Sequence, residues 1–309
     1  MTSTVTTILT HSGSFHGDDL FAYAVLRRLF PEAALLRTRD EKIIAAAGDE
    51  TLVFDIGGAF DPARGRFDHH QPDKPRRGDG LPYSSFGLVW ASYGRARIAA
   101  ELGGDLSPEE IEDIHSAIDG GLVRDIDAVD NGAPMPDQDG VMHPLTLPWL
   151  LMDFRPDFDD DTPGAMDAAF VEAAAVAEAF LGKRIRRAAS ELRAEDAVAT
   201  AIAQRTDPRW VELPRGMPWH GPLLDSGADE ILFVVNPAPG EWQLNVVNIA
   251  EHSFIARKSL PEDWAGLRGS RMETASGVEG AVFCHSGRFI ATADSRDAVL
   301  ALLEKALAD

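Results

Sequence analysis

The sequence predicts an α/β protein in which a mostly parallel sheet, flanked by helices, is followed by a smaller α+β domain. Three observations support this fold class. Short apolar, β-leaning segments alternate with helical patterns between residues 5 and 54, polar side chains follow the ends of these segments, and the last third of the chain contains paired strands instead. At 309 residues, the chain is long enough for two domains of ordinary size.

The first five elements are predicted in the order strand, helix, strand, helix, strand. The strands cover residues 5–10, 33–38 and 52–54, and the helices between them cover residues 20–30 and 40–47. Pro31 ends the first helix because proline cannot continue the helical hydrogen bonds. This order favours parallel strands joined by right-handed crossovers. We therefore expect the carboxyl ends of the strands to share one edge of the sheet, where α/β proteins bind ligands.

The remaining elements separate the chain into two parts. Helices are predicted at residues 84–102, at 108–119 with Ser107 as the N-cap, and at 165–204, where apolar residues recur every three or four positions. Strands follow at residues 231–235, 242–247, 281–284 and 289–293, and a closing helix at 296–307. We expect an N-terminal domain at residues 1–206 and a smaller C-terminal domain at residues 207–309.

Composition excludes several classes of protein. The 29 basic and 50 acidic residues give a formal net charge of −21, so we do not expect the chain to wrap duplex nucleic acid, whereas a local groove for a short strand remains compatible. No apolar run reaches the roughly 20 residues that span a bilayer, and the start lacks the basic region of a signal peptide. Cys284 is the only cysteine, so no intrachain disulfide forms and a cytoplasmic location is expected.

Side chains able to bind metal ions gather in four places within the first 130 residues. Taken alone, each place has a simpler interpretation as a polar loop, a helix cap or an acidic helix end. Three of them lie on loops or strand ends that a parallel sheet brings to one edge, and the fourth lies on a helix, where residues three apart share a face. The residues are His11, His16 and Asp18; Asp55; the triplet Asp68, His69 and His70; and Asp127 and Asp130.

Together these residues predict a site for two divalent metal ions. Two cations about 3.5–4 Å apart need roughly this many oxygen and nitrogen ligands, including one carboxylate that bridges them. Asp55 is the natural bridge, because the short apolar strand at residues 52–54 would hold it rigidly at the sheet edge. The choice between Asp127 and Asp130 stays open, although Asp130 fits the helix end better.

Several sequence segments carry a resemblance to a known family. They are THSGSFHGDD at 10–19, DIGG at 55–58, FDHHQ at 67–71, SSFGLVW at 84–90, DAVDNG at 127–132, and residues 260–268 and 277–285. Their order resembles the DHH phosphoesterase superfamily, which includes RecJ-like exonucleases, oligoribonucleases and family II inorganic pyrophosphatases. More closely, nearly the whole chain resembles the family of the melanocyte-proliferating-gene exonuclease, formerly labelled a metal-dependent protein hydrolase.

The resemblance implies roles for individual residues. One metal ion would be bound by His11, His16 and Asp55, and the other by Asp18, Asp55, His69 and Asp130; Mn²⁺ is the expected ion, with Mg²⁺, Zn²⁺ or Fe²⁺ as alternatives. His70 would lie beside the scissile phosphate and act with Asp55 in catalysis. The superfamily has an aspartate where this chain has His16. The C-terminal domain would be a DHHA-like substrate-binding module, without the usual Gly-Gly-His signature, and its candidate substrate-binding residues are Arg257, Lys258, Arg268, His285 and Arg288.

The activity implied by the resemblance is metal-dependent phosphodiester hydrolysis, by an exonuclease acting on short single-stranded RNA or DNA. Two alternatives stay open: a hydrolase of a small phosphoanhydride or nucleotide, which the few basic residues and few tyrosines favour, and a metal-stabilised binding protein without turnover. Assembly into a homo-oligomer is also left open. Proteolysis has no support, because the ligand set suits phosphate better than a peptide carbonyl.

Overall fold

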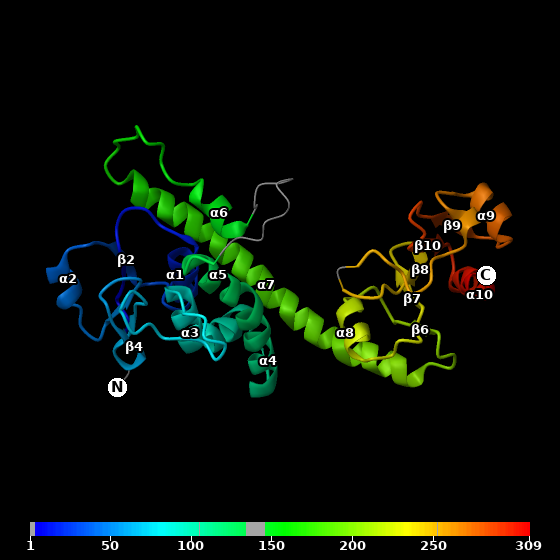
Figure 1. The fold of residues 1–309 in the computed structure, drawn as a ribbon, viewed down its shortest axis with the longest axis horizontal. Helices are drawn as coiled ribbons and strands as arrows, with labels where there is room; N and C mark the ends of the chain where they lie inside the picture. Colours follow the sequence, from blue (N-terminus) through cyan, green and yellow to red (C-terminus); the bar gives the residue numbers. More distant parts are fainter. Residues whose placement is uncertain (1–3, 105, 134–145, 252) are drawn as a thin grey trace. The chain divides into compact units, whose positions relative to one another are not determined.

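The computed structural model describes residues 4–104, 106–133, 146–251 and 253–309. Contacts between residues divide the chain into two compact units, Met1–Ala189 and Ser190–Asp309. The dividing point lies inside one long helix, α7 (Ala165–Gln204). Each unit contains a five-stranded sheet of its own, with helices packed around it (Figure 1). The predicted α/β fold class is therefore confirmed.

The sheet of the first unit is mostly parallel. Its strands lie in the order β2 (Ala34–Arg37), β1 (Thr7–Thr10), β3 (Thr51–Phe54), β5 (Arg66–Phe67) and β4 (Phe60–Asp61). The pairs β2–β1, β1–β3 and β3–β5 are parallel, and β4 pairs antiparallel with β5. β3 is buried along its whole length. Since parallel strands end at one edge, the residues that follow β1, β3 and β5 come together there.

Helices α1 (Gly17–Leu29) and α3 (Ser85–Leu102) pack against each other in the first unit, where the rings of Phe21 and Phe86 lie 5.3 Å apart. α3 begins where the Ser84 side chain accepts a hydrogen bond from the backbone N–H of Gly87. The short helix α2 (Glu41–Ala45) begins in the same way, at Asp40. These caps satisfy N–H groups that the first turn of a helix leaves unpaired.

A π-helical turn, η2 (Asp119–Val123), joins helix α4 (Pro108–Ile118) to helix α5 (Arg124–Asp130) without a break. A π turn closes hydrogen bonds between residues i and i+5, so it contains one residue more than an α turn. Each residue of an α-helix advances the helix by about 100°. The extra residue in η2 therefore sets the directions in which the side chains of α5 point.

The second unit is an α+β structure built on a mixed sheet. Its strands lie in the order β6 (Trp210–Glu212), β7 (Phe233–Ala238), β8 (Glu241–Val246), β10 (Ile290–Ala293) and β9 (Ala281–Cys284). Only the β6–β7 pair is parallel. Helix α10 (Arg296–Ala308) packs on this sheet, and the core between them includes Phe233, Leu244 and Leu302.

Most long elements agree with the sequence predictions. The helix at 165–204 agrees at both ends, and the hairpin of β7 and β8 lies where strand patterns flank a proline–glycine turn. The sequence did not predict several short elements: β4, β5, β6, the 3₁₀ turns η1 (Pro62–Arg64) and η3 (Glu262–Trp264), and helices α6 (Leu147–Met152), α8 (His220–Asp225) and α9 (Ser270–Ser276).

We expect His115 to make the stability of the first unit depend on pH. The His115 ring is buried and stacks on Trp90, with ring centroids 5.3 Å apart. Burial, together with the charge of Arg95, lowers the pKa of His115 below its ordinary value of 6.5. The unfolded chain therefore binds this proton more readily than the folded chain, so the contribution of His115 is present above about pH 6.5 and is lost as the pH falls through the lowered folded-state pKa.

His115→Gln removes this titration. Urea unfolding at several values between about pH 7.5 and 5.5 should show that the free energy of unfolding falls less with acidification in the variant than in the wild type. Equal slopes for the two proteins would mean that His115 makes no such contribution.

Candidate metal centre

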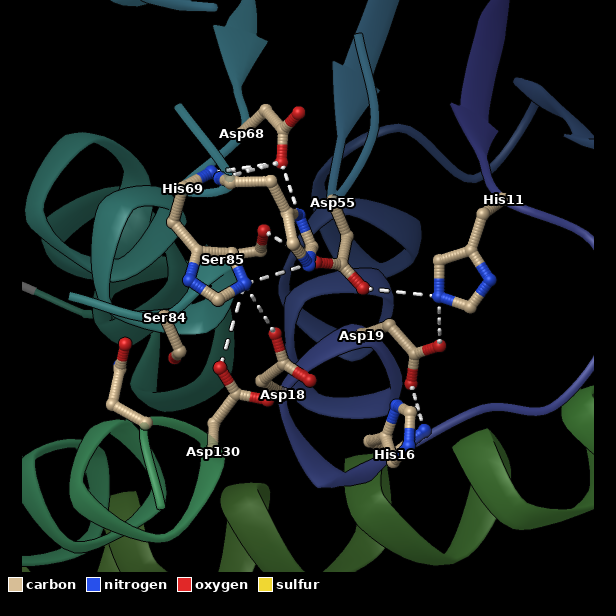
Figure 2. A network of polar contacts seen from close by, with 12 residues as sticks. His11, His16, Asp18, Asp19, Asp55, Asp68, His69, Ser84, Ser85 and Asp130 are labelled. Carbon is tan, nitrogen blue, oxygen red and sulfur yellow. Dashed lines mark hydrogen bonds and ion pairs between the residues drawn. The ribbon is translucent and has the colours of Figure 1, made fainter. Parts of the chain in front are cut away.

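The end of β1 and the start of α1 bring one histidine and two aspartates together. His11 follows β1 directly, and Asp18 and Asp19 lie in the first turn of α1; all three are buried. Nε2 of His11 lies 3.2 Å from Oδ2 of Asp19 and 3.0 Å from Oδ2 of Asp55. The backbone N–H of His16 donates to Oδ1 of Asp19 at 2.9 Å, as Figure 2 shows, and so fixes this carboxylate.

Asp55 follows β3 and lies between two histidines. Its φ of 57° is in the left-handed region, which aspartate tolerates better than most residues other than glycine. Oδ2 faces His11, whereas Oδ1 lies 3.3 Å from Nε2 of His69 and accepts a hydrogen bond from Oγ of Ser85 at 3.0 Å. The two oxygens of one carboxylate thus face two separate groups of ligands (Figure 2).

Asp68, which follows β5, orients the two histidines after it. Oδ1 of this buried side chain accepts hydrogen bonds from the backbone N–H of His69 at 2.8 Å and lies 2.7 Å from Nδ1 of His70. The hydrogen bond with Asp68 raises the pKa of His70, whose side chain is 59% exposed. His70 is therefore held in place while its ring remains open to a ligand.

Asp127 and Asp130 of α5 have different surroundings. Oδ1 of the fully buried Asp127 accepts hydrogen bonds from the backbone N–H and Oγ of Ser84, at 2.9 and 2.6 Å, and its Oδ2 accepts one from Nε of Arg77 at 2.6 Å. Oδ2 of Asp130 instead lies 3.4 Å from Nε2 of His69. Asp127 is thus occupied by structural hydrogen bonds, whereas Asp130 faces His69, another candidate metal ligand.

Within the described residues, ligand atoms lie within 4.8 Å of one another in three groups that share members: His11, Asp19 and Asp55; Asp18, His69 and Asp130; and Asp55, His69 and His70. We call these residues the acid–histidine cluster. The resemblance implied His16 beside His11 and Asp55, and in the structure Asp19 forms a group with these two residues. His16 lines the same cavity but belongs to none of these three groups.

Burial and the neighbouring charged groups shift the pKa values of the cluster's members. Burial raises the pKa of Asp18, and the charges of Asp55 and Asp130 raise it further. Burial also raises the pKa of Asp130. Burial favours the neutral form of Asp55 as well, but the hydrogen bonds with His11 and His69 outweigh it and lower its pKa. Burial lowers the pKa of His11, but Asp19 and Asp55 outweigh it and raise the value to about 10.

The cluster suits divalent cations. Both oxygens of Asp18 and Nδ1 of His69 are buried and make no hydrogen bond within the described part of the chain. Leaving a buried polar atom unpaired is unfavourable, and a cation would supply the missing partner of a carboxylate. Carboxylate oxygens and imidazole nitrogens are the ligands that manganese-, iron- and zinc-type ions accept. The residues present therefore fit the binding of such cations.

All members of the cluster except Asp19 line a cavity of about 780 Å³, whose lining also includes basic and apolar residues. Arg39, just after β2, and Lys74 are basic, and an apolar wall consists of Ile126, Val129, Pro148, Trp149 and Met152. Nε of Arg39 donates to the carbonyl of Ser12 at 2.8 Å, and Nζ of Lys74 donates to Asn131 at 3.1 Å. The cavity thus combines anionic ligands for cations, basic groups for an anion and an apolar surface.

The five residues predicted to bind substrate lie in the second unit, in different surroundings. Arg257 donates to the carbonyls of Ala228 and Ile231 and pairs with Asp229. The guanidinium of Arg268 lies 4.1 Å from the ring centre of Phe283, Arg288 donates to the carbonyl of Leu260, and the rings of His285 and Phe289 lie 4.3 Å apart. Lys258 is half-buried. Arg257 is already bound to protein groups, so it is less available to a ligand than Arg268.

Sequence reasoning missed Asp19, Arg39 and Ser85 as neighbours of the site. Asp19 stands beside Asp18, and only one of the two was selected. Arg39 stands directly after the second predicted strand, so the rule that selected Asp55 would also have found it. Ser85 carries no sequence signal of its own, because a serine at the start of a helix is ordinarily explained by capping.

The chain resembles known proteins along nearly its whole length. The model of the family MYG1_exonuc, described as an uncharacterised protein family (UPF0160), matches residues 7–307. The MYG1 exonuclease of Homo sapiens is 33% identical over 97% of this chain and 85% of its own length. The MYG1 protein of Saccharomyces cerevisiae is 32% identical over 97% of this chain and 95% of its own length.

Two solved structures also resemble the chain, both at low sequence identity. RecJ of Thermus thermophilus in complex with Mn²⁺ has a TM-score of 0.29 and 15% identity, and the match covers 98% of this chain and 52% of RecJ, so the chain spans about half of that protein. PggH of Vibrio cholerae, a pGpG-specific phosphodiesterase, has a TM-score of 0.32 and 14% identity, with 98% of this chain and 97% of PggH covered.

The family match and the relatives named exonucleases place the protein among the phosphoesterase enzymes, and its Asp-His-His triplet and acid–histidine cluster at the sheet edge offer side chains that could hold metal ions. In the described ranges, every helix is too short or too polar to cross a membrane. The family match over residues 7–307 and the relatives at about a third identity assign the protein further: the chain belongs to the MYG1 exonuclease family.

Proposed function

We propose that the chain hydrolyses phosphodiester bonds in short single-stranded RNA or DNA as an exonuclease, with two divalent cations bound by the acid–histidine cluster. The observation that carries the proposal is the position of Asp55, whose two oxygens face His11 on one side and His69 on the other. Asp19 and His11 would complete one ion site with Asp55, and Asp18, His69 and Asp130 the other. His16 stays a further candidate for the first ion, because it lines the same cavity.

Mn²⁺ is the proposed ion; such cations would lower the pKa of a bound water and offset charge on the phosphate oxygens. The protein's own groups position the substrate and move protons. His70, hydrogen-bonded to Asp68 and half exposed, is placed to donate a proton to a phosphate oxygen or leaving group. Arg39 and Lys74 supply positive charge at the same cavity, where Nε and Nη2 of Arg39 also contact Ser12 and His11.

Residues 207–309, which lie within the second unit, are the proposed substrate-binding domain. Lys258, Arg268, His285 and Arg288 remain candidates to contact the rest of the substrate, and Arg257 would first have to give up its bonds to Ala228 and Ile231. A cytoplasmic location is retained from the single cysteine. A homo-oligomer is retained as an open alternative.

The experiment that tests this function combines a metal count with an activity assay. Protein purified without chelator should contain two divalent ions per chain by elemental analysis. With Mn²⁺ it should shorten RNA oligomers, and separate 5′ and 3′ end labels give the direction of attack. Chelation should abolish cleavage, and added Mn²⁺ should restore it. Pyrophosphate hydrolysis without oligomer cleavage would favour the phosphoanhydride alternative, and a protein without metal affinity would contradict the proposal.

A further inference from the structure

Helix α6 (Leu147–Met152) is packed closely against the metal-ligating loop. A Cβ atom added at Gly17, the first residue of α1, would lie 2.8 Å from Cβ of Pro148. Leu151 on the same short helix is buried, with 1% of its surface exposed. After α6, Arg155 donates hydrogen bonds to the carbonyl of Phe15, in the loop that carries His16. α6 is therefore held in a fixed position beside Asp18 and Asp19.

Trp149 is the unusual residue of this helix. Its side chain lines the cavity of the acid–histidine cluster, and 51% of its surface is exposed. Pro148 and Met152 line the cavity beside it, and Ile126 and Val129 of α5 complete the apolar wall. Leu150, the next residue, is also exposed, at 45%, but it does not line the cavity. Pro148, Trp149 and Met152 of α6 therefore belong to the apolar wall of the cavity, whereas Leu150, although exposed, does not.

A phosphate group alone gains nothing from such a wall, because an anion is better solvated by water than by carbon. A nucleobase does gain, since its flat, weakly polar faces stack on aromatic rings. A tryptophan side chain also has only two rotatable bonds, so it loses little side-chain freedom when it stacks on a ligand. The cavity therefore suits a ligand with a phosphate at one end and a base at the other better than a bare diphosphate.

We propose that Trp149 stacks on the nucleobase next to the phosphodiester bond that is hydrolysed, so that the first unit by itself selects a nucleotide. This inference rests on the proposed function and specifies its substrate class. Trp149 contacts the base and takes no part in proton transfer. Small phosphoanhydrides, which have no base to stack on the wall, are selected against.

The test compares adenosine 5′-monophosphate with ribose 5-phosphate, which carries the same phosphate and sugar but has a hydroxyl group in place of the base. Neither contains a phosphodiester, so their binding to the Mn²⁺-loaded protein is an equilibrium measured by calorimetry. The variants are Trp149→Ala, Trp149→Phe, which keeps an aromatic ring, and the matched control Leu150→Ala, which removes an equally exposed neighbour. Thermal melts of each variant establish that it is folded.

The wild type should bind the nucleotide about 10- to 100-fold more tightly than the sugar phosphate, which corresponds to the range for one stacked base. Trp149→Ala should lower the affinity for the nucleotide alone, so that the two affinities become similar. Trp149→Phe should retain most of the difference between them. Leu150→Ala should behave as the wild type. With dinucleotide substrates, Trp149→Ala should raise KM much more than it lowers kcat.

Other outcomes separate this inference from the proposed function. If Trp149→Ala lowers the affinity for both ligands equally, Trp149 has a structural role and the inference is wrong, even if dinucleotides are still cleaved. An unchanged preference for the nucleotide would do the same. A change in the oligomeric state of Trp149→Ala but not of ligand preference would assign the wall to a second copy of the chain. A wild type that binds metal but cleaves no dinucleotide would contradict the proposed function instead.

Discussion

Asp55→Asn should abolish hydrolysis, with a loss of at least about 10³-fold in kcat. Asp55 is the residue that both proposed ion sites share, through its contacts of 3.0 Å to His11 and 3.3 Å to His69. An asparagine has nearly the same shape, and it tolerates the left-handed backbone of this position. Its amide carries no charge and presents only one oxygen, so it cannot bridge two cations. The measurements are steady-state kinetics and a metal count on the purified variant.

A matched control distinguishes loss of the site from loss of charge in general. Asp73 is an exposed aspartate in the loop after His70 and belongs to none of the three ligand groups. Asp73→Asn should keep both ions and nearly full activity. Two ions per chain and wild-type turnover in Asp55→Asn would show that the proposed bridge is wrong.

Asp127→Ala and Asp130→Ala should have opposite effects, although the two residues lie three positions apart on one helix. Removing the Asp127 carboxylate takes away one of the two acidic partners of Arg77 and leaves the buried backbone N–H of Ser84 without its acceptor. Breaking a buried ion pair in this way costs about 3–5 kcal/mol of unfolding free energy. Loss of activity in Asp127→Ala should therefore follow from loss of folded protein.

Asp130→Ala should instead leave the metal-free protein as stable as the wild type, or more so. Burial and the neighbouring carboxylates raise the pKa values of Asp130 and Asp18, so the ionised carboxylates are unfavourable in the folded protein, and the substitution removes one of them. Metal affinity and activity should fall. Urea unfolding in the presence of a chelator measures the first effect, and metal titration measures the second. If Asp130→Ala unfolds easily while Asp127→Ala stays stable and loses metal, the roles assigned to the two carboxylates are reversed.

The sequence predicted the elements whose signals are local. Alternation of apolar strands and amphipathic helices is enough to place β1, β2 and β3 and the long helices, and strand ends are enough to select His11 and Asp55. Two-residue strands such as β4 and β5 have no period to detect. They exist because neighbouring strands supply the hydrogen bonds, which is information from the tertiary structure.

Individual residues of the site were also hard to predict, because their contacts depend on the tertiary structure. The loop at residues 71–81 has the composition of a solvated segment, yet Arg77 within it is almost buried and pairs with both Asp119 and Asp127. In the same way, Asp127 could be separated from Asp130 only once Arg77 and Ser84 were located. Partners distant in the sequence decide which carboxylates are structural, and one sequence does not reveal those partners.

The number of residues in the π turn η2 is more tightly constrained than the identity of those residues. If one residue were deleted from Asp119–Val123, the turn could close as an ordinary α turn, and all of α5 would rotate by about 100°. Asp130 would then move away from His69, and Asp127 away from Arg77, so a single deletion would remove a proposed metal ligand and a buried ion pair together. Substitution is less constrained, because a Cβ atom at Gly120 or Gly121 would meet no atom within 4 Å. The number of residues in this turn, more than the identity of its two glycines, therefore directs Asp127 toward Arg77 and Asp130 toward His69.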